Sequence, residues 1–433
     1  MEHPGVTSSS DTIVALSSGA PPAAIGVIRV SGPHAHAALQ RVAGAVPAPR
    51  RASLRSLRDS DGNLVDEALV LWLPGPDNAT GEDSAELHCH GGRAVIAAVE
   101  RVLLAGPGMR LAQPGEFTRR AFANGRMDLA QAEGLADLLF AETELQRQVL
   151  QTSAGGALSR IFTDWRARIL NLAAQVEAVL DFDDEDDVAS LSPSFYAEVE
   201  TLCGELREWL ARPRVERLRD GVRTVFAGPP NAGKSTLFNA LLRSEAAIVS
   251  PTAGTTRDVI ERPVAFDGVP FTLVDTAGIH EGGDDTIERI GIDRARAALS
   301  GADIVLWLGA EGEGPPGSWE VEAKCDAPDR ASKSTARFQV SAHTGEGLET
   351  LVTALGREGS RLLPKPGEGA VNERQHALLD EAEKALVRIS SEQDALILAE
   401  HLRTARVCFD RILGNATTED MLDTLFGRFC IGK

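Results

Sequence analysis

The stretch Gly228-Pro-Pro-Asn-Ala-Gly-Lys-Ser235 decides how the middle of this chain folds. The apolar run 224–227 before it is typical of a strand, and the run 236–242 after it has helical spacing. A glycine-rich loop between a strand and a helix presents backbone N–H groups to phosphate oxygens. The stretch therefore predicts a phosphate-binding loop, in which Lys234 contacts the terminal phosphates and the Ser235 hydroxyl binds Mg²⁺.

Three further motifs occur in the order found in Ras-like GTPases. Asp275-Thr-Ala-Gly278 ends a strand candidate, which places a carboxylate beside a Mg²⁺-bound water and a glycine N–H near a γ-phosphate. Gly254-Thr-Thr-Arg-Asp258 lies upstream and supplies Thr256 as a Mg²⁺ ligand. Ser341-Ala-His343 follows another strand candidate and resembles the loop that backs a guanine base. Together these motifs predict a GTP-binding domain.

Two positions depart from the usual pattern. Ala323-Lys-Cys-Asp326 stands where Asn-Lys-x-Asp is usual, so the carboxylate for the guanine base is kept and the side-chain amide is lost. We expect guanine selectivity to be weakened but retained. Ile279 stands where many of these enzymes have the glutamine that orients the attacking water. Catalysis must then depend on other groups, for which Asn231, the 250–255 loop and Glu288 are candidates.

Hydrophobic periodicity predicts an α/β + α protein. Short apolar runs with turn signals over residues 1–120 indicate a small α+β domain, whereas helical spacing prevails over 121–218 and 366–433. Strand-like runs separated by glycine loops over 219–365 indicate a doubly wound α/β domain. Because helical segments flank that domain, we predict a discontinuous helical bundle with an inserted Ras-like P-loop GTPase domain, preceded by the N-terminal α+β domain.

The composition excludes several classes of protein. The 433 residues carry a formal net charge of −19, so broad neutralisation of a nucleic-acid backbone is not expected. The five cysteines include no CxxC pair, which argues against a disulfide framework or a zinc ribbon and favours a reducing cytoplasm. No apolar stretch is long enough to span a bilayer, and the N-terminus does not read as a signal peptide. We expect a cytoplasmic protein that meets nucleic acid locally or through a partner.

Further stretches outside the nucleotide motifs point to one family. They are Asp11-Thr-Ile-Val-Ala15, Gly26-Val-Ile-Arg-Val-Ser-Gly32, Thr80-Gly-Glu-Asp83, His90-Gly-Gly92, Pro114-Gly-Glu-Phe-Thr118, Asp128-Leu-Ala-Gln-Ala-Glu133 and Phe429-Cys-Ile-Gly-Lys433. With them the chain resembles the MnmE (TrmE) family of tRNA modification GTPases, among the TrmE-Era-like GTPases, over nearly its whole length. The resemblance implies an N-terminal folate-binding and dimerisation domain, a discontinuous helical domain and an inserted G domain.

The resemblance also implies a reaction and its partners. A homodimer would join the FAD-dependent protein MnmG in a heterotetramer and act on C5 of the wobble uridine of certain tRNAs, with the tRNA held mainly through the partner. The uridine would receive an aminomethyl or carboxymethylaminomethyl group from 5-formyl- or methylene-tetrahydrofolate. GTP, Mg²⁺ and K⁺ would serve as the other cofactors.

The resemblance assigns roles residue by residue. Lys234, Thr256 and Glu288 would be catalytic, with Glu288 positioning the water. K⁺ would be held by Asn231, Ser250, Thr252 and Thr255, and Mg²⁺ by Ser235 and Thr256. Folate contacts would fall on Arg29, Glu86, Arg126 and Lys433. The nucleotide contacts would be Asn231, Ala232, Gly233, Lys234, Ser235, Thr236, Ser250, Pro251, Thr252, Ala253, Gly254, Thr255, Thr256, Asp275, Thr276, Ala277, Gly278, Ala323, Lys324, Cys325, Asp326, Ser341, Ala342 and His343.

Two alternatives stay open at the level of sequence. The GTPase motifs alone also fit a GTP-driven assembly switch for ribosome or complex formation that performs no tRNA chemistry. The folate residues and the Cys-Ile-Gly-Lys ending favour the modification enzyme, because an assembly switch has no use for them. Cys430 is either a packed small hydrophobe or a reactive thiol near the folate.

Overall fold

The structure is a computed structural model, and it describes residues 11–181, 191–244, 247–249, 260–276, 297–327 and 332–432. The chain divides into two compact units, Met1–Ala136 with Val407–Lys433, and Asp137–Arg406. The division falls inside helices α4 (Leu129–Leu139) and α13 (Ala395–Leu413). The domain borders predicted after residues 120, 218 and 365 stay predictions.

The first unit contains a six-stranded sheet in the order β3-β4-β5-β2-β1-β6. Neighbouring strands are antiparallel except β1 and β6, which run parallel. In β4 the side chains of Ala68, Val70 and Trp72 are buried at every second position, as expected for a strand with one face on a core. The strands are β1 (Thr12–Leu16), β2 (Ile25–Ser31), β3 (Ser53–Arg58), β4 (Leu64–Leu73), β5 (Ser84–His90) and β6 (Met109–Leu111).

Helices cover the two faces of this sheet unequally. Apolar residues of α1 (Ala35–Ala43) and α2 (Arg93–Leu104) share one core with the buried side of the strands. On the other face, Phe117 of α3 (Glu116–Ala123) packs with Ile13, Ala15 and Ala112 in a smaller cluster. The prediction of an N-terminal α+β domain is therefore confirmed.

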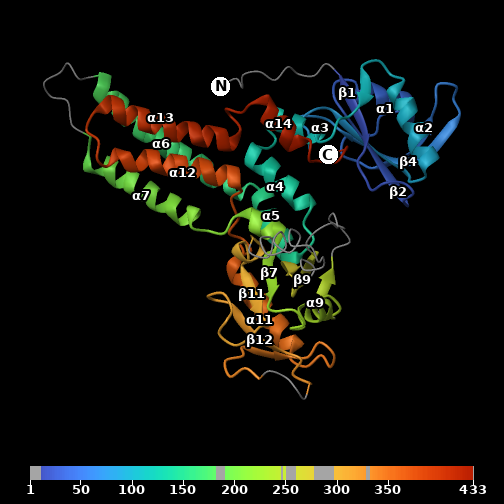
Figure 1. The fold of residues 1–433 in the computed structure, drawn as a ribbon. Helices are drawn as coiled ribbons and strands as arrows, with labels where there is room; N and C mark the ends of the chain where they lie inside the picture. Colours follow the sequence, from blue (N-terminus) through green and yellow to red (C-terminus); the bar gives the residue numbers. More distant parts are fainter. Residues whose placement is uncertain are drawn as a thin grey trace, which may run out of the picture. The chain divides into compact units, whose positions relative to one another are not determined.

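The last residues of the chain pack on this first unit. Helix α14 (Glu419–Phe426) lies beside α3, with the rings of Phe122 and Phe426 6.2 Å apart (Figure 1). Beyond α14, Ile431 forms an isolated antiparallel bridge with Pro114. The C-terminus is thus part of the same unit as β1, although the two are separated by almost the whole sequence.

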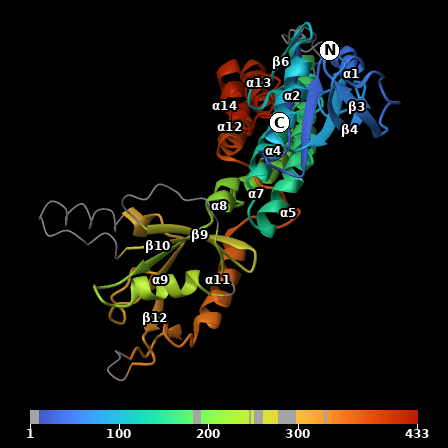
Figure 2. The ribbon, with the colours of Figure 1, turned by 90° about the vertical axis from the view of Figure 1, so that its right-hand side faces the viewer.

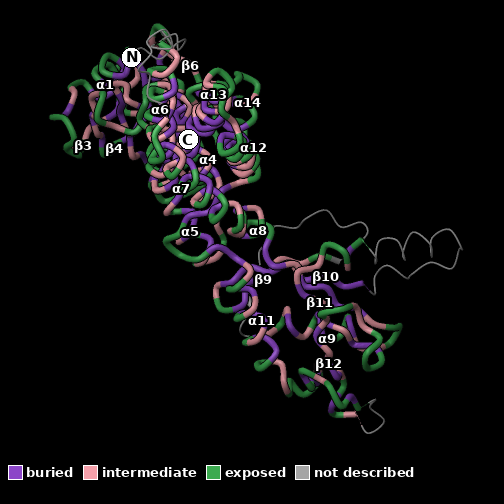
Figure 3. The backbone as a smooth tube through the Cα atoms, turned by 90° about the vertical axis from the view of Figure 1, so that its left-hand side faces the viewer, coloured by how far each residue is buried: buried purple, intermediate pink, exposed green. Residues whose placement is uncertain are grey.

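A seven-stranded sheet forms the nucleotide-domain part of the second unit, in the order β13-β12-β11-β7-β10-β9-β8. The pairs from β13 to β10 are parallel, and β9 and β8 extend the sheet antiparallel. Figure 3 shows much of β10 and β11 as buried. The strands are β7 (Val222–Ala227), β8 (Ala247–Val249), β9 (Ile260–Phe266), β10 (Val269–Asp275), β11 (Ile304–Trp307), β12 (Trp319–Ala323) and β13 (Phe338–Val340).

One face of this sheet buries a large apolar core. Side chains of α9 (Lys234–Leu242) and α11 (Leu348–Leu362) contribute to it, and both helices lie against the strands in Figure 2. Val149 and Leu150 of α5 (Glu144–Ala154), with Val215 and Leu218 of α8 (Val215–Asp220), join the same core. The sheet is therefore packed directly against helices that precede it in the sequence.

Long helices make up most of the rest of the second unit: α6 (Ala157–Asp181), α7 (Pro193–Leu210), α12 (Glu373–Ile389) and the first part of α13. Arg207 of α7 pairs with Glu383 of α12 at 2.7 Å, and these helices run alongside each other in Figure 1. The Val215 N–H donates to the Val371 carbonyl at 3.0 Å, so the chain enters and leaves the nucleotide domain at neighbouring points. The predicted helical bundle with an inserted domain is confirmed.

No helix among the described residues is long and apolar enough to cross a membrane.

Candidate functional site

The phosphate-binding loop joins β7 to α9, as the motif predicts. Its backbone is left-handed at Asn231, with φ 62°, and at Gly233, with φ 99°. At Gly228, φ is 144° and an added Cβ would lie 2.9 Å from the Gly309 nitrogen, so only glycine fits there. The loop leads directly into the N-terminus of α9, where an anion is favoured.

Lys234 begins α9 and is 4% exposed. Burial lowers the pKa of its ammonium, while the charge of Asp275 opposes that effect. The ammonium donates to the carbonyls of Gly228 and Pro229, each at 2.8 Å, which holds it across the mouth of the loop. A cation in this position is suited to binding phosphate oxygens.

The predicted Mg²⁺ ligand Ser235 and Asp275, predicted to hold a Mg²⁺-bound water, lie on adjacent elements. Asp275 ends β10 and is paired in register with Phe226 near the end of β7, so its carboxylate reaches the edge of the sheet beside the loop. Thr276 donates through its hydroxyl to the Phe226 carbonyl at 2.7 Å. Ser235 follows Lys234 and is exposed. A hydroxyl and a buried carboxylate at one edge are oxygen ligands of the kind that Mg²⁺ prefers.

The two guanine motifs are joined to each other. A hydrogen bond with the Ser341 hydroxyl, together with backbone and His343 contributions, lowers the pKa of Asp326. The Ser341 oxygen in turn accepts from the N–H groups of His343 at 3.2 Å and Thr344 at 3.1 Å. The Cys325 N–H donates to the Val340 carbonyl at 3.2 Å. Asp326 is therefore held as an ionised acceptor, which suits the donor edge of a guanine.

The guanine motif also reaches the phosphate-binding loop. The Lys324 ammonium donates to the Asn231 carbonyl at 2.7 Å. A Cβ placed on Gly233 would lie 3.5 Å from the Ala323 side chain, which is ordinary van der Waals contact. Thus residues 231–236, 275–276, 323–326 and 341–343 converge at one edge of the sheet.

Sequence reasoning missed a set of charged residues behind this edge. Lys333 is 7% exposed and pairs with Glu320 at 2.7 Å, and Glu322, which precedes the guanine motif, is 1% exposed. The one sign of this cluster in the sequence is Glu322, a charged residue at a position where a strand of this sheet would bury its side chain. The partner of a buried carboxylate cannot be read from spacing alone.

Two of the residues predicted for folate are ion-paired. Arg29 on β2 and Glu86 on β5 are in register, and their side chains meet at 2.9 Å. The Arg29 guanidinium also lies 5.7 Å from the centre of the Phe117 ring. Arg126 contacts the Asn78 carbonyl at 3.1 Å. Among the described residues, no hydrogen bond or ion pair joins Arg126 to the Arg29–Glu86 pair.

The C-terminal segment approaches the same sheet. The Gly115 N–H donates to the Cys430 carbonyl at 3.4 Å. Gly432 has φ 95°, and a Cβ there would lie 2.3 Å from the Leu16 carbonyl oxygen, so the tail rests against the end of β1. Residue 15 on that strand is in register with Arg29. Cys430 itself is exposed, so the structure does not pack it as a core residue.

Several predicted residues lie outside the described part of the chain. They are Ser250, Pro251, Thr252, Ala253, Gly254, Thr255, Thr256, Ala277, Gly278, Glu288 and Lys433. Their assigned roles in K⁺ binding, water positioning and folate binding stay predictions.

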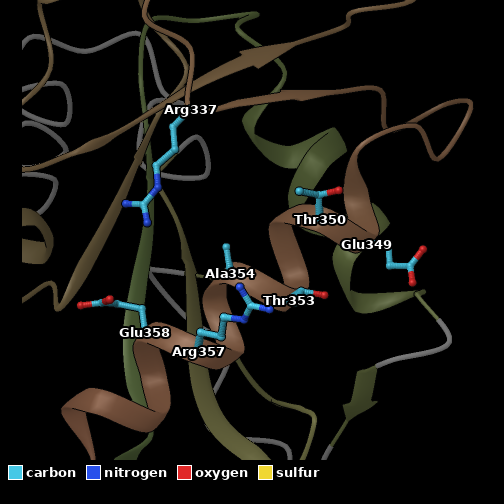
Figure 4. Close-up of a pocket in the computed structure, with 7 residues that line it drawn as sticks. All are labelled: Arg337, Glu349, Thr350, Thr353, Ala354, Arg357 and Glu358. Atoms are coloured by element: carbon cyan, nitrogen blue, oxygen red, sulfur yellow. The ribbon is translucent and has the colours of Figure 1, made fainter.

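A cavity of about 450 Å³ opens on the nucleotide domain away from these motifs. It is lined by Arg337, before β13, and by six residues along α11 (Figure 4). Its lining combines two arginines with Glu349 and Glu358 and includes none of the predicted site residues.

Comparison with known proteins shows which family the chain is similar to. The family described as "MnmE helical domain" matches residues 129–430, and "GTP-binding protein TrmE N-terminus" matches residues 12–126. The chain belongs to the MnmE family. This membership agrees with the convergence of the nucleotide motifs and with the N-terminal sheet that carries the Arg29–Glu86 pair.

Relatives in the MnmE family match along their full length. The tRNA modification GTPase MnmE of Erythrobacter litoralis (strain HTCC2594) is 71% identical, over 98% of this chain and 100% of its own. That of Novosphingobium aromaticivorans is 58% identical, with the same two coverages. A solved structure of Era in complex with MgGDPNP and 16S ribosomal RNA is 26% identical over 38% of this chain and 67% of its own, with a TM-score of 0.25. As an MnmE-family member, the chain is a GTP hydrolase of tRNA modification.

Proposed function

We propose that this chain is a K⁺-activated GTPase that works with MnmG to modify C5 of the wobble uridine in certain tRNAs, using a one-carbon tetrahydrofolate. Its product is the aminomethyl or carboxymethylaminomethyl uridine. The proposal goes beyond family membership in four points: the activating ion, the partner, the folate and the modified position.

The observation that carries the GTPase part is the meeting of Lys234, Asp275 and Asp326 at one edge of the seven-stranded sheet. Lys234 supplies a cation for phosphate oxygens, Ser235 supplies a hydroxyl ligand for Mg²⁺, and Asp275 would hold a Mg²⁺-bound water. Asp326, whose pKa is lowered chiefly by its hydrogen bond with Ser341, would accept hydrogen bonds from the base. Parallel strands bring their carboxyl ends to a common edge. The three groups, which are far apart in the sequence, can therefore contact different parts of one nucleotide.

The K⁺ part rests on Asn231. Its left-handed backbone turns at the lip of the phosphate-binding loop, and its exposed side chain is free to offer a carbonyl oxygen there. An amide oxygen is a suitable ligand for K⁺, and a monovalent cation at this place would supply charge stabilisation of the kind an arginine finger gives. Ser250, Thr252 and Thr255 would complete the site, and Glu288 would position the water.

The folate part rests on the first unit. Arg29 and Glu86 form a charged pair on its sheet, and Gly432, the residue before Lys433, lies at the end of β1. Cations near a carboxylate suit the glutamate tail and the pterin edge of a folate. Arg126 would extend this site.

We further propose that the chain acts as a homodimer in the cytoplasm, within a heterotetramer with MnmG that holds the tRNA. The net charge of −19 supports binding of tRNA mainly through the partner, because this chain has an excess of acidic groups.

Mass spectrometry of wobble uridines tests the proposed function. In tRNA from cells that lack this protein, we expect the C5 modification to be missing from the affected tRNAs and to return with a plasmid copy of the gene. The Lys234→Ala variant should fail to restore it. Unchanged modification in the deletion strain would contradict the proposal and favour a GTP-driven assembly switch.

A further inference from the structure

A buried lysine lies behind the guanine edge of the nucleotide domain. The side chain of Lys333 is 5% exposed, and its ammonium donates to the Trp307 carbonyl at 2.9 Å and to a Glu320 carboxylate oxygen at 2.7 Å. Trp307 ends β11 and Glu320 lies on β12, so this one cation joins two neighbouring strands to the segment that precedes β13. A buried ammonium that donates to two fixed acceptors is held in one place.

The backbone of the same residue contacts the strand that leads into the guanine motif. The Lys333 N–H donates to a Glu322 carboxylate oxygen at 3.2 Å, and the Gln339 side chain donates to the same oxygen at 3.3 Å. Glu322 is 1% exposed and immediately precedes Ala323. The carboxylate of Glu322 is therefore fixed between β12 and the segment that precedes β13.

A second carboxylate clasps the residues that follow Lys333. Glu311 accepts from the N–H of Ser334 at 2.9 Å, from the Ser334 hydroxyl at 2.7 Å and from the N–H of Thr335 at 2.7 Å. These hydrogen bonds lower the pKa of Glu311 to about 2, so the carboxylate is ionised across the physiological pH range. The 332–335 segment is thus tied to the loop that follows β11.

That loop touches the phosphate-binding loop. A Cβ placed on Gly309 would lie 2.9 Å from the Cδ of Pro229, and one on Gly228 would lie 2.9 Å from the Gly309 nitrogen. Contacts therefore run without a break from Gly228 through the Gly309–Glu311 loop and Lys333 to Glu322 and the guanine motif.

We propose that Lys333 is a positioning residue for guanine recognition, which fixes the Ala323–Asp326 motif in place of the side-chain amide that this chain lacks at residue 323. The inference rests on the proposed nucleotide site. In that site an amide at residue 323 would brace the motif from within the loop. Here the bracing comes from behind, through the acceptors of Lys333 on β11 and β12 and the carboxylate of Glu322. Asp326 then keeps its alignment with the base although the side chain of Ala323 offers no hydrogen bond.

Nucleotide binding by the full-length protein tests this role. GDP and IDP are each titrated against a bound fluorescent GDP analogue. IDP lacks the exocyclic amino group from which Asp326 would accept a hydrogen bond, so the ratio of the two affinities reports on that contact. For Lys333→Met we expect a GDP affinity about tenfold lower and a smaller ratio of GDP to IDP affinity. The reason is that losing the charged hydrogen bonds of the Lys333 ammonium displaces the Asp326 carboxylate. Lys333→Arg keeps a cation, so its GDP affinity and its ratio of GDP to IDP affinity should lie between those of Lys333→Met and the wild type. Lys384→Met is the matched control, because Lys384 forms an exposed pair with Asp380 on α12.

Restoring the amide separates positioning from general stability. The double variant Ala323→Asn with Lys333→Met should regain most of the lost GDP affinity and of the GDP to IDP ratio, since the loop is then braced from within. An unchanged GDP to IDP ratio in Lys333→Met, or no gain from Ala323→Asn, would overturn the inference. If Lys333→Met does not fold, the exposed Glu311→Gln variant is used, and a ratio equal to that of the wild type would overturn it in the same way.

The same titrations distinguish this inference from the proposed site. Asp326→Asn should bind XDP better than GDP whatever the role of Lys333. If it does so while Lys333→Met matches the wild type, only the inference fails. If the wild type binds ADP as tightly as GDP, the proposed guanine site fails and the inference with it.

Discussion

The Lys324 ammonium donates a hydrogen bond to the Asn231 carbonyl at 2.7 Å, and this bond joins the guanine motif to the phosphate-binding loop. Both residues have a left-handed backbone, with φ 60° at Lys324 and 62° at Asn231. Such conformations are costly for residues with a side chain and persist where the surroundings hold them. The two loops therefore support each other's geometry.

We expect Lys324→Met to weaken GTP and GDP binding by about tenfold, because a charged hydrogen bond contributes roughly 1.5–3 kcal/mol. Titration with a fluorescent GDP analogue measures the change. Lys365→Met is the control, since Lys365 is exposed and lies after α11, outside the nucleotide motifs. Equal loss of affinity in both variants would show that the bond to Asn231 has no particular part in binding.

The carboxylate of Asp326 should determine the choice of base. The wild type is expected to bind GTP in preference to ATP, and Asp326→Asn to prefer XTP, whose additional carbonyl needs a donor. Without the usual amide at Ala323, one polar contact is missing, so the wild-type affinity should be lower by about 0.5–1.5 kcal/mol than with an asparagine there. Competition binding with the three nucleotides gives the order of affinities. Tight ATP binding by the wild type would contradict the assignment.

Hydrolysis should require Mg²⁺ and should be faster in K⁺ than in Na⁺. Ile279 cannot orient water, and Asn231 would hold the monovalent ion, whose radius decides whether it bridges the phosphates. Charge stabilisation of this kind is worth about 10³–10⁵ in rate when an arginine finger supplies it. Steady-state phosphate release is measured in the two salts at matched ionic strength. Asn231→Ala should remove the difference, and equal wild-type rates in both salts would rule the mechanism out.

A reduced folate should bind to the first unit. Removal of the Arg29 guanidinium should cost about 1.5–3 kcal/mol of affinity if its hydrogen bond to the ligand forms. Calorimetry with 5-formyltetrahydrofolate compares the wild type, Arg29→Ala and a chain that ends at Gly432. Arg93→Ala provides a control, because Arg93 starts α2 and its exposed guanidinium donates to the Pro21 carbonyl at 3.2 Å. Full binding by both the Arg29 variant and the truncated chain would eliminate the proposed site.

Two neighbouring arginines of α3 should differ sharply in their effect on stability. Arg120 is 6% exposed and meets the carboxylates of Asp11, Glu82 and Glu116 at 2.9–3.0 Å. Arg120→Met removes a buried guanidinium from three carboxylates, of which Asp11 and Glu116 keep Arg110 as a partner, and should lower the free energy of unfolding by about 3 kcal/mol, the lower end of the cost of breaking a buried ion pair. Arg119→Met removes only exposed pairs with α14 and should cost at most about 1 kcal/mol. Urea unfolding compares the two, and similar losses would refute the distinction.

The pH dependence of the same cluster provides a further check. Burial would raise the pKa of Asp11 and of Glu116, but hydrogen bonds from Arg110 and Arg120 outweigh it, so both pKa values are lowered from 3.8 and 4.5. The stability these carboxylates contribute is complete above those ordinary values and is lost as the pH falls through the lowered ones. The difference between the wild type and Arg120→Met should therefore shrink below pH 4.5. A difference that is constant with pH would contradict the role of the ion pairs.

The nucleotide site could be predicted from the sequence because each of its parts is local. The run from Gly228 to Ser235 carries its turn, its cation and its hydroxyl within one strand–loop–helix unit. Asp275 ends one apolar strand and Ser341 follows another, and parallel strands deliver such residues to one edge. The insertion of the nucleotide domain was also predictable, because helical periodicity resumes after it. For these features short-range spacing is sufficient information.

Only the tertiary structure determined which distant residues meet. Asp11 and Arg120, Glu311 and Ser334, and Leu16 and Gly432 are brought together by strand order and helix packing, which spacing does not encode. In the sequence, Lys333 is one of the six lysines of the whole chain, and it lies in a polar segment. Its burial depends on where β11, β12 and the segment before β13 lie side by side. Long-range contacts of this kind arise from the packing of whole elements, so their charged partners become visible only when the fold is complete.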